Sequence, residues 1–378
     1  RVIGVLDPSA DPAALAARLE NDKRVPAKVE TERDYLKSQT QATSATFLFL
    51  GGLLGAIMGV AVRAGLTITF VGLKSGLYLD AGPAFAGDIV FAGLDIPVEC
   101  RDGEAPIMRR IDGKILDKAL PSRKRDAHKG HFGHVLVVGG GPGMPGAVRL
   151  CGESALRVGA GLVSIATHPD HSMLVPASRP ELMCHGVASA DDLRPLLDRA
   201  SVIAVGPGLG DSEWSGDILD AVLESSLPMV IDADALNLLA DRGARADDWI
   251  LTPHPGEAAR LLGLSTQEVQ ADRRAALASL VDRYGGISVL KGSGTLVSSR
   301  KGQPWLCSAG NPGMASAGMG DVLTGVIAGL RAQKLSSGLA AVAGVQVHAM
   351  AGDRAAESGE RGLIASDLIA EIRACVNP

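Results

Sequence analysis

Short apolar runs recur along the chain, and each is followed by a polar loop that contains glycine or aspartate. Consecutive apolar residues are typical of a strand that is buried on both faces of a sheet. Segments with the apolar period of an α-helix follow most of these loops, and strands that alternate with helices predict a parallel sheet with crossover helices. The predicted strands cover residues 66–70, 134–139, 162–167, 202–205, 229–232, 250–251 and 287–290, and the predicted helices include 147–158, 257–262 and 271–282.

The loops after four of the predicted strands carry most of the polar residues that could perform chemistry. They read GPGLG (206–210), DADALN (232–237), TPHPGE (252–257) and KGSGT (291–295). In open α/β sheets, ligands bind beyond the carboxyl ends of the strands. We therefore expect these loops to form one shared site.

A further glycine-rich segment, NPGMASAGMGD (311–321), runs directly into an apolar helical pattern over residues 322–330. Glycines let backbone N–H groups crowd together, and a helix N-terminus adds free donors and a partial positive charge. The segment is suited to hold a phosphate, and Asp321 at its end is placed to take a proton from an attacking hydroxyl. The alternative is a turn whose aspartate only caps the helix.

Residues 139–146 read GGGPGMPG and satisfy the dinucleotide-binding pattern G-x-G-x-x-G. However, Pro142 and Pro145 remove backbone donors that a pyrophosphate would use. The next predicted strand ends in Thr-His-Pro (167–169) rather than in an acid that would hold a ribose. This match is a weak signal, and a tight strand-to-helix turn is the alternative.

Composition excludes several classes of protein. The chain has 378 residues, 46% apolar and 21% charged, as expected for a globular protein with a full core. The net charge of −5 and the lack of a basic stripe argue against nucleic-acid binding. The five cysteines are scattered without a C-x-x-C pair, which argues against a disulfide framework or a zinc site and favours a reducing compartment.

The front of the chain has a different character. Residues 1–45 are polar, and residues 47–62 (FLFLGGLLGAIMGVAV) carry no charge. This apolar stretch is borderline in length for a membrane helix, so a membrane span and a buried core helix are about equally supported. Residues 31–60 resemble the junction before a membrane helix in FtsX/MacB-like transporter permeases. Since companion membrane helices are missing and the chain does not begin with Met, we expect residues 1–63 to be a fragment, foreign to the rest.

Residues 66–98 resemble the last strands of the NAD(P)H-hydrate epimerase domain. The Asn-Asn-Gly-Gly-Asp-type loop and the catalytic aspartate of that domain are not in the sequence, so we predict that epimerase activity is absent. The charged stretch 101–125 is interpreted as a connection. The predicted domains are thus a permease-like piece (1–63), an epimerase remnant with its linker (64–120), and a catalytic domain (121–378).

The five ordered motifs between residues 206 and 321, with KGHFGHVLVVGG (129–140) in front of them, resemble the ADP/ATP-dependent NAD(P)H-hydrate dehydratase family over residues 128–372. The resemblance implies a ribokinase-like three-layer α/β/α fold with a mostly parallel sheet, here preceded by a remnant of a second α/β domain. It also implies dehydration of the S epimer of hydrated NADH or NADPH with ADP or ATP and Mg²⁺, a cytoplasmic catalytic domain and a homo-oligomer. Residues 47–62 leave membrane attachment open.

The same resemblance assigns roles to single residues. Asp321 is the expected catalytic base, and the N–H groups of Gly318, Met319 and Gly320 would hold the transferring phosphoryl group. Ala147, Gly208, His254 and Asp321 are expected to contact the substrate. The expected nucleotide contacts are Lys291, Gly292, Ser293, Gly294, Thr295 and Gly320. The alternative is a hairpin, since predicted strands over 295–299 and 303–307 flank the turn 300–302.

Three further features stay open. Asp232, Asp234 and Asn237 either hold Mg²⁺ through water or belong to a helix N-terminus with Asp234 as its cap. His348 and Asp353, on a predicted helix over 339–354, are expected to face a partner or solvent. Relatives often carry an aromatic residue before the Gly-Ala of the substrate loop, where this chain has Pro145-Gly146-Ala147.

Two other functions fit part of the pattern. A ribokinase-like kinase of a small alcohol, such as a thiazole or a hydroxymethylpyrimidine, would use the same phosphate cradle and the same aspartate. A non-enzymatic permease piece that carries a passenger domain is the third reading. The TPHPGE loop and the epimerase remnant favour the dehydratase.

Overall fold

The structure is a computed structural model that describes residues 64–95 and 106–377. The permease-like segment 1–63, with its apolar stretch 47–62, lies outside the described residues. No helix within the described ranges combines the length and apolar character that crossing a bilayer requires. By internal contacts the chain divides into two compact units, residues 1–67 with 84–88 and residues 68–83 with 89–378. The boundaries expected after residues 63 and 120 stay predictions.

A ten-stranded sheet forms the centre of the second unit, in the order β3-β12-β11-β10-β9-β8-β7-β4-β5-β6. All neighbours pair in parallel except β11, which runs antiparallel to β10 and β12. The strands are β3 (Arg109–Arg110), β4 (His134–Val138), β5 (Leu162–Thr167), β6 (Met183–Gly186), β7 (Val202–Val205), β8 (Met229–Ile231), β9 (Trp249–Leu251), β10 (Ile287–Leu290), β11 (Thr295–Ser299) and β12 (Trp305–Cys307). A separate two-stranded sheet contains β1 (Leu66–Phe70) and β2 (Asp88–Ala92).

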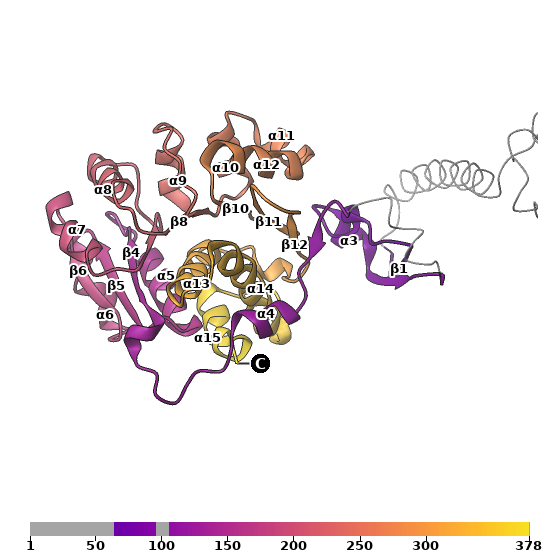
Figure 1. The fold of residues 1–378 in the computed structure, drawn as a ribbon, viewed down its shortest axis with the longest axis horizontal. Helices are drawn as coiled ribbons and strands as arrows, with labels where there is room; N and C mark the ends of the chain where they lie inside the picture. Colours follow the sequence, from indigo (N-terminus) through magenta and orange to yellow (C-terminus); the bar gives the residue numbers. More distant parts are fainter. Residues whose placement is uncertain (1–63, 96–105, 378) are drawn as a thin grey trace, which may run out of the picture. The chain divides into compact units, whose positions relative to one another are not determined.

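Helices cover both faces of the large sheet (Figure 1), which confirms the predicted three-layer fold. One face carries α7, α8, α9, α10 and α12, and the other carries α5, α13 and α14. The described helices are α3 (Gly82–Ala86), α4 (Lys114–Ala119), α5 (Pro145–Val158), α6 (Leu174–Ala177), α7 (Ala190–Leu197), α8 (Glu213–Leu223), α9 (Ala233–Leu239), α10 (Pro255–Leu262), α11 (Thr266–Ala271), α12 (Arg273–Tyr284), α13 (Met319–Ala332), α14 (Ser337–Ala355) and α15 (Ala365–Cys375).

Strand β4 shows why the sequence forms a two-faced core. Val135 and Val137 point into the core on the α5 and α13 side, whereas Leu136 and Val138 point into the core on the α8 and α9 side. All four side chains are fully buried. A strand buried on both faces needs apolar residues at every position, because successive side chains alternate between the faces.

The topology places a ligand crevice beside β4. The chain runs from β4 outward to β5 and β6, and then returns to β7 on the other side of β4. The loops after β4 and β7 therefore leave the sheet side by side. Gly140 and Gly141 donate from their backbone N–H groups to the carbonyls of Pro207 (3.0 Å) and Gly208 (2.7 Å). Such a switch point is where open α/β sheets bind ligands.

Several elements differ from their predicted form. The helix expected over 271–282 is α12, which begins at Arg273 because Asp272 caps it by accepting from the backbone N–H of Ala275 (2.9 Å). The short helix α11 in front of it was not predicted. The stretch 101–125, interpreted as a connection, contributes β3 to the sheet, and α4 lies against α14. Strand β6, with the sequence MCHG, was not predicted because it lacks an apolar run.

Candidate active site

The glycine-rich segment ends in the first turn of α13, which begins at Met319, three residues before the predicted start. Gly318 is the N-cap residue with φ 88°, a left-handed conformation that glycine adopts without strain. Asp321 is therefore the third helical residue. Its carboxyl group belongs to the helix N-terminus itself rather than to a loop in front of it.

The turn presents free backbone donors. The first hydrogen bond of α13 runs from the N–H of Val322 to the carbonyl of Gly318 (3.0 Å). The N–H groups of Met319, Gly320 and Asp321 precede that bond, so the helix geometry leaves them available to a ligand. Together with the helix dipole they make an anion site of the predicted kind.

Asp321 lies in surroundings that oppose its negative charge. Burial raises the pKa of its carboxyl group to about 7, and the nearby carboxylate of Asp232 acts in the same direction. Lys291 partly counteracts this effect, while Asp234 and Glu257 add to it. A carboxyl group with a pKa near neutrality is suited to accept and release a proton at physiological pH.

Lys291 lies in a buried ion-pair network. Its Nζ is 2.6 Å from Asp232 Oδ1 and 3.6 Å from Glu257 Oε2. These two carboxylates raise the pKa of the lysine, against the opposing effect of burial. A Cβ atom on Gly320 would lie 3.4 Å from Lys291 Nζ, so the lysine loop meets the phosphate loop at this glycine. The structure thus brings together the KGSGT, DADALN, TPHPGE and GMGD motifs.

Sequence reasoning missed two members of this network. Thr324, one turn along α13, donates from Oγ1 to Asp232 Oδ2 (2.8 Å) and is fully buried. Glu257 was part of the TPHPGE motif but had no assigned role. Neither pairing has a local sequence signal, because each joins elements that are far apart along the chain. The one sequence signal for Thr324 was its place as a polar residue in an apolar helix, because a buried polar side chain needs a hydrogen-bond partner.

A buried arginine, also missed, holds the lysine loop. Arg273, at the start of α12, is only 3% exposed. Its Nη2 donates to the carbonyls of Leu290 and Lys291 (3.2 Å each), and its Nη1 donates to that of Ser293 (2.5 Å). The hairpin of 295–299 with 303–307 that was the alternative is formed by β11 and β12, and residues 291–294 form the turn of a second antiparallel hairpin between β10 and β11. A hairpin turn and a nucleotide contact are compatible.

His254 has a structural role in addition to any contact with a ligand. Its Nδ1 accepts from the backbone N–H groups of Gly256 (3.0 Å) and Glu257 (3.2 Å), and it thereby caps α10. The Glu257 carboxylate accepts in return from the His254 N–H (2.7 Å). The imidazole is about half exposed, and its Nε2 lies 3.4 Å from Glu257 Oε1.

The two residues expected at close backbone approach meet at the switch point. A Cβ atom on Gly208 would lie 3.0 Å from the Cβ of Ala147 and 2.8 Å from that of Met144. Gly208 has φ 55°. The loop after β4 uses the N–H groups of Gly140 and Gly141 to pair with the loop after β7, so they are not free for a pyrophosphate. The strand-to-helix turn is therefore the correct interpretation of GGGPGMPG.

The aspartates of DADALN do not form a metal cluster. Asp232 occupies the N-cap position of α9, so the alternative with Asp234 as cap is wrong. Both oxygens of Asp232 are paired with Lys291 and Thr324, and Asp234 Oδ2 accepts from the Gly210 N–H (2.8 Å). Among residues 64–95 and 106–377, no group of three or more acidic, histidine or cysteine side chains could hold a metal ion. Any Mg²⁺ would have to arrive with phosphate oxygens as ligands.

The expected orientation is wrong for His348, whose ring contacts the segment that leads into α13. Asp353 lies on the same helix, α14, and is exposed to solvent as expected, but its carboxylate also contacts this segment. His348 Nε2 lies 2.9 Å from the Met319 carbonyl oxygen. Asp353 accepts from the N–H of Gly310 and from the side-chain amide of Asn311, at 3.0 Å each.

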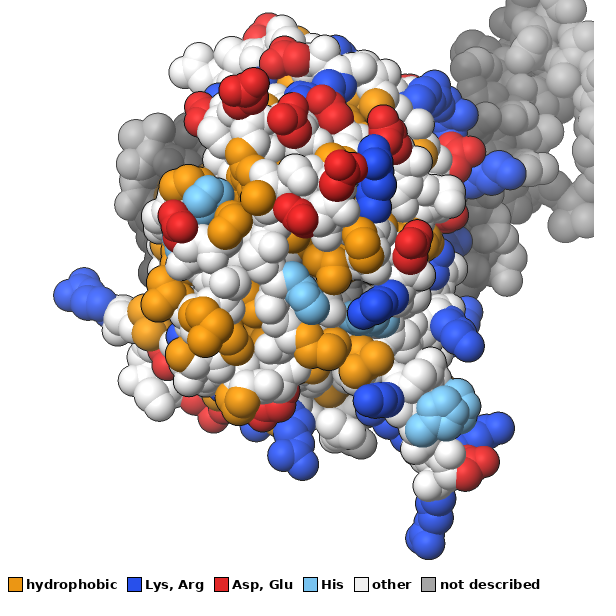
Figure 2. All heavy atoms as spheres, turned by 90° about the vertical axis from the view of Figure 1, so that its left-hand side faces the viewer, with side chains coloured by type: hydrophobic (Ala, Val, Ile, Leu, Met, Phe, Trp, Pro, Cys, Tyr) orange, Lys and Arg blue, Asp and Glu red, His pale blue; other side chains and the backbone are white. Residues whose placement is uncertain are grey.

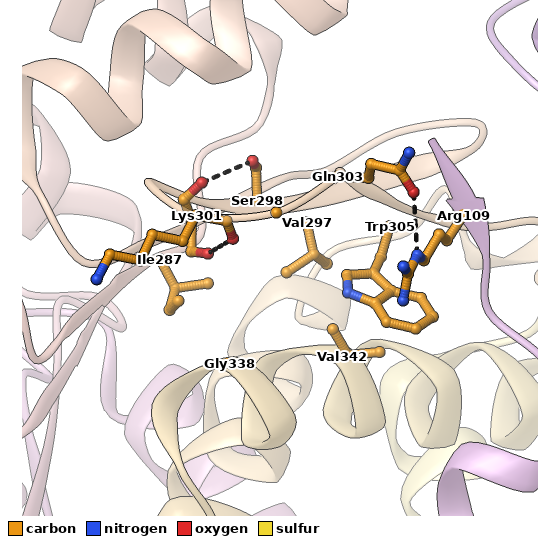
Figure 3. A pocket seen from close by; sticks show the side chains of 11 residues that line it. Arg109, Ile287, Val297, Ser298, Lys301, Gln303, Trp305, Gly338 and Val342 are labelled. Atoms are coloured by element: carbon orange, nitrogen blue, oxygen red, sulfur yellow. Dashed lines mark hydrogen bonds between the residues drawn. The ribbon is translucent and has the colours of Figure 1, made fainter. Parts of the chain in front are cut away.

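A separate pocket of about 180 Å³ lies away from this edge of the sheet (Figure 3). Its lining includes Ile287, which begins β10, and Trp305, which begins β12. These residues mark the amino ends of the strands, opposite to the loops described above. The candidate site is therefore the network around Asp321 and not this pocket.

In comparison with known proteins, residues 135–374 match a family described as NAD(P)H-hydrate dehydratase. The bifunctional NAD(P)H-hydrate repair enzyme Nnr of Coxiella burnetii is 54% identical over 325 residues, which are 86% of this chain and 67% of that enzyme. The chain spans 62 to 67% of the length of its curated bacterial relatives.

Two solved structures resemble the fold. An ADP/ATP-dependent NAD(P)H-hydrate dehydratase from Bacillus subtilis, co-crystallised with ATP and Mg²⁺, aligns with a TM-score of 0.63 at 29% identity, covering 72% of this chain and 98% of that one. A ribokinase-like superfamily protein from Enterococcus faecalis aligns with a TM-score of 0.65 at 28% identity, covering 72% and 96%.

Proposed function

The chain belongs to the NAD(P)H-hydrate dehydratase family, and on this premise we propose that it dehydrates the S epimer of hydrated NADH or NADPH, with ADP or ATP as the phosphoryl donor. The observation that carries the proposal is the position of Asp321. Its carboxyl group has a pKa of about 7 and lies in the first turn of α13, where free backbone N–H groups can bind an anion.

The reaction begins with proton transfer. The Asp321 carboxylate takes the proton of the ring hydroxyl as that oxygen attacks the terminal phosphorus of the nucleotide. An O–P bond forms, and the bond to the leaving AMP or ADP oxygen breaks. The N–H groups of Gly318, Met319 and Gly320 stabilise the charge on the transferring phosphoryl oxygens. The C–O bond of the phosphate ester then breaks, inorganic phosphate leaves with the bond electrons, a neighbouring ring proton is lost, and the double bond is restored.

The lysine loop is the proposed nucleotide site. The ammonium group of Lys291 is held by Asp232 and Glu257, and it lies beside Gly320. Ser293 would supply a further donor to a phosphate. Gly294 packs against the Tyr78 carbonyl, and the Thr295 hydroxyl donates to the Gly292 carbonyl (3.1 Å), so these two residues shape the loop. The solved Bacillus subtilis relative was co-crystallised with ATP and Mg²⁺, which supports a metal–nucleotide complex here.

The hydrated ring is proposed to bind at the switch point. Gly208 and Ala147 bring two backbones close together there, and the exposed side of His254 faces outward from the start of α10. Because Nδ1 of His254 is engaged in the helix cap, a substrate would contact its Nε2, which lies 3.4 Å from Glu257 Oε1.

The test uses the full chain with the purified S epimer of hydrated NADH, ADP or ATP, and Mg²⁺. We expect the near-ultraviolet absorbance of the reduced nicotinamide to return. Asp321→Asn should lower kcat by roughly 10²–10⁴-fold and keep nucleotide binding, since it removes the base but preserves the shape. Asp282→Asn, an exposed position on α12, is the matched control.

Two results would contradict this proposal. One is normal turnover by the Asp321→Asn variant, which would exclude that residue as the base. The other is no turnover of the hydrate together with phosphorylation of a thiazole or hydroxymethylpyrimidine alcohol, which would favour the kinase alternative.

The proposed assembly is a cytoplasmic homo-oligomer. Strand β6 is one edge of the large sheet, and near it Met173 and Leu174 are 81% and 61% exposed. Figure 2 shows apolar side chains gathered on the face that carries this edge of the sheet. An unpaired edge beside apolar side chains favours contact with a second copy. Light scattering on the purified chain tests this, and a monomer at micromolar concentration would contradict it.

A further inference from the structure

Helix α14 supports the segment that forms the anion site, although it contributes no residue to the proposed catalytic groups. Residues of its C-terminal half face residues 310–319. A Cβ atom on Gly352 would lie 2.3 Å from the sulphur of Met314, so the segment packs directly onto the helix backbone at this glycine.

One contact lies at the catalytic end of the segment. His348 Nε2 is 2.9 Å from the carbonyl oxygen of Met319, the first residue of α13. Burial lowers the pKa of His348 to about 4, so the ring is neutral at pH 7. A carbonyl oxygen only accepts hydrogen bonds, and Nε2 must therefore carry the hydrogen and donate. This bond ties the residue between Gly318 and Gly320 to α14.

The other contact lies at the opposite end. The two carboxylate oxygens of Asp353 accept from the Gly310 N–H and from the side-chain amide of Asn311, at 3.0 Å each. Asn311 Oδ1 in turn accepts from the Gly313 N–H (3.0 Å). The Asp353 carboxylate thus fixes the start of the segment through two donors. The bond between Asn311 Oδ1 and the Gly313 N–H also orders the turn that follows.

We propose that His348 and Asp353 are positioning residues, which clamp the two ends of the glycine-rich segment onto α14 and so aim the N–H groups of residues 318–320 at the transferring phosphoryl group. The proposal rests on the proposed function. Glycines make the segment adaptable but also costly to order, since glycine loses the most conformational freedom on folding. Backbone N–H donors stabilise the charge that develops in a transition state most strongly when they are already oriented before the reaction.

The test compares variants that remove or keep each bond. His348→Met removes the donor at similar volume, and we expect kcat to fall by about 10- to 100-fold while KM for hydrate and nucleotide changes by less than about threefold. His348→Gln retains a donor near the Nε2 position, and we expect it to restore kcat to within about threefold of the wild type. Asp353→Ala should also lower kcat, and Asp353→Asn should recover part of it.

The matched control is Arg354→Met. It lies next to Asp353 on α14 and breaks the exposed ion pair between Arg354 Nε and Glu371 Oε2 (2.9 Å) without touching the segment. We expect this variant to keep wild-type kcat. A loss of kcat equal to that of His348→Met would show that any perturbation of α14 has this effect, and it would overturn the proposal.

Amide hydrogen exchange provides a readout that does not need turnover. We expect the amides of residues 310–321 to exchange faster in His348→Met and Asp353→Ala than in the wild type or Arg354→Met. If the wild type fails to dehydrate the hydrate but this exchange pattern is found, the proposed function fails and the clamp stands. Unchanged exchange and unchanged kcat in both variants would reject the clamp. Should His348→Met fail to fold, Asp353→Ala and His348→Gln decide the question.

Discussion

The carboxyl group of Asp321 is destabilised as an anion by burial and by the charge of Asp232, and it is partly stabilised by Lys291. These opposing effects bring its pKa to about 7. Asp321 could be interpreted from the sequence motif in two ways, as a catalytic base beside a phosphate site or as a helix cap. Its environment was not predictable, because Asp232, Lys291 and Thr324 come from separate elements that only the tertiary fold brings together.

The pKa of Asp321 predicts how activity depends on pH. A general base must be deprotonated in the free enzyme, so kcat/KM should rise between about pH 6 and pH 8 with an apparent pKa of about 7. Initial rates across a series of buffers of constant ionic strength measure this dependence. A profile that is flat from about pH 5 to pH 8 would contradict the assignment of the base.

The same shift predicts a stability difference. The folded pKa of about 7 lies above the ordinary aspartate value of 3.8. The carboxyl group therefore favours folding below its unfolded pKa, and this contribution is lost as the pH rises through about 7. Asp321→Asn stays neutral, and it should therefore be more stable than the wild type at pH 8, by on the order of 2 kcal/mol, with little difference at pH 4. Urea unfolding at the two pH values tests this prediction. A variant that is less stable than the wild type at pH 8 would be inconsistent with it.

At the scale of elements, apolar runs and glycine loops predicted most strands of the large sheet within one residue. The misses have physical causes. Strand β6 (MCHG) contains too few apolar residues to be recognised as a strand. Helix α12 begins at a capping aspartate, which lies inside a continuous helical pattern and does not mark a boundary in the sequence. Helix α13 begins at Met319, which is buried in the core, and the polar or small residues Gly320 and Asp321 interrupt its apolar pattern before Val322.

The approach of α5 to α13 depends on glycine. A Cβ atom on Gly325 would lie 2.0 Å from the Cys151 carbonyl oxygen and 2.1 Å from Ser154 Oγ. Gly325→Ala should therefore destabilise the protein by roughly 2–4 kcal/mol, although alanine is the better helix former by about 1 kcal/mol. Thermal unfolding measures the effect.

Gly338→Ala is the control for this comparison. Gly338 lies in the first turn of α14, and a Cβ atom there meets only Ile287 Cδ1 at 3.8 Å, an ordinary contact. We expect this variant to be as stable as the wild type or slightly more stable. Equal effects of the two substitutions would show that helix propensity, and not the approach of α5 to α13, decides the outcome.

At the scale of the whole molecule, the sheet order explains why motifs spread between residues 147 and 321 lie at the same edge of the sheet. The return of the chain from β6 to β7 places the substrate loops next to each other, and the later strands bring the lysine loop and α13 to the same edge. Loop order along the sequence indicated a shared edge. It did not indicate that α14 would hold the phosphate loop, since an apolar helix near the end of a chain gives no sign of what it touches.

A polypeptide of residues 1–378 is also predicted to lack epimerase activity. Residues 66–98 resemble only the last strands of an epimerase domain, and the loop and aspartate that would perform the chemistry are not in this sequence. With the R epimer of hydrated NADH, ADP and Mg²⁺, we expect recovery no faster than spontaneous epimerisation allows. Chromatographic separation of the epimers over time, with a protein-free sample as reference, measures this rate. Recovery that exceeds the reference would disprove the prediction, and addition of a separate epimerase should restore full recovery if the dehydratase proposal is correct.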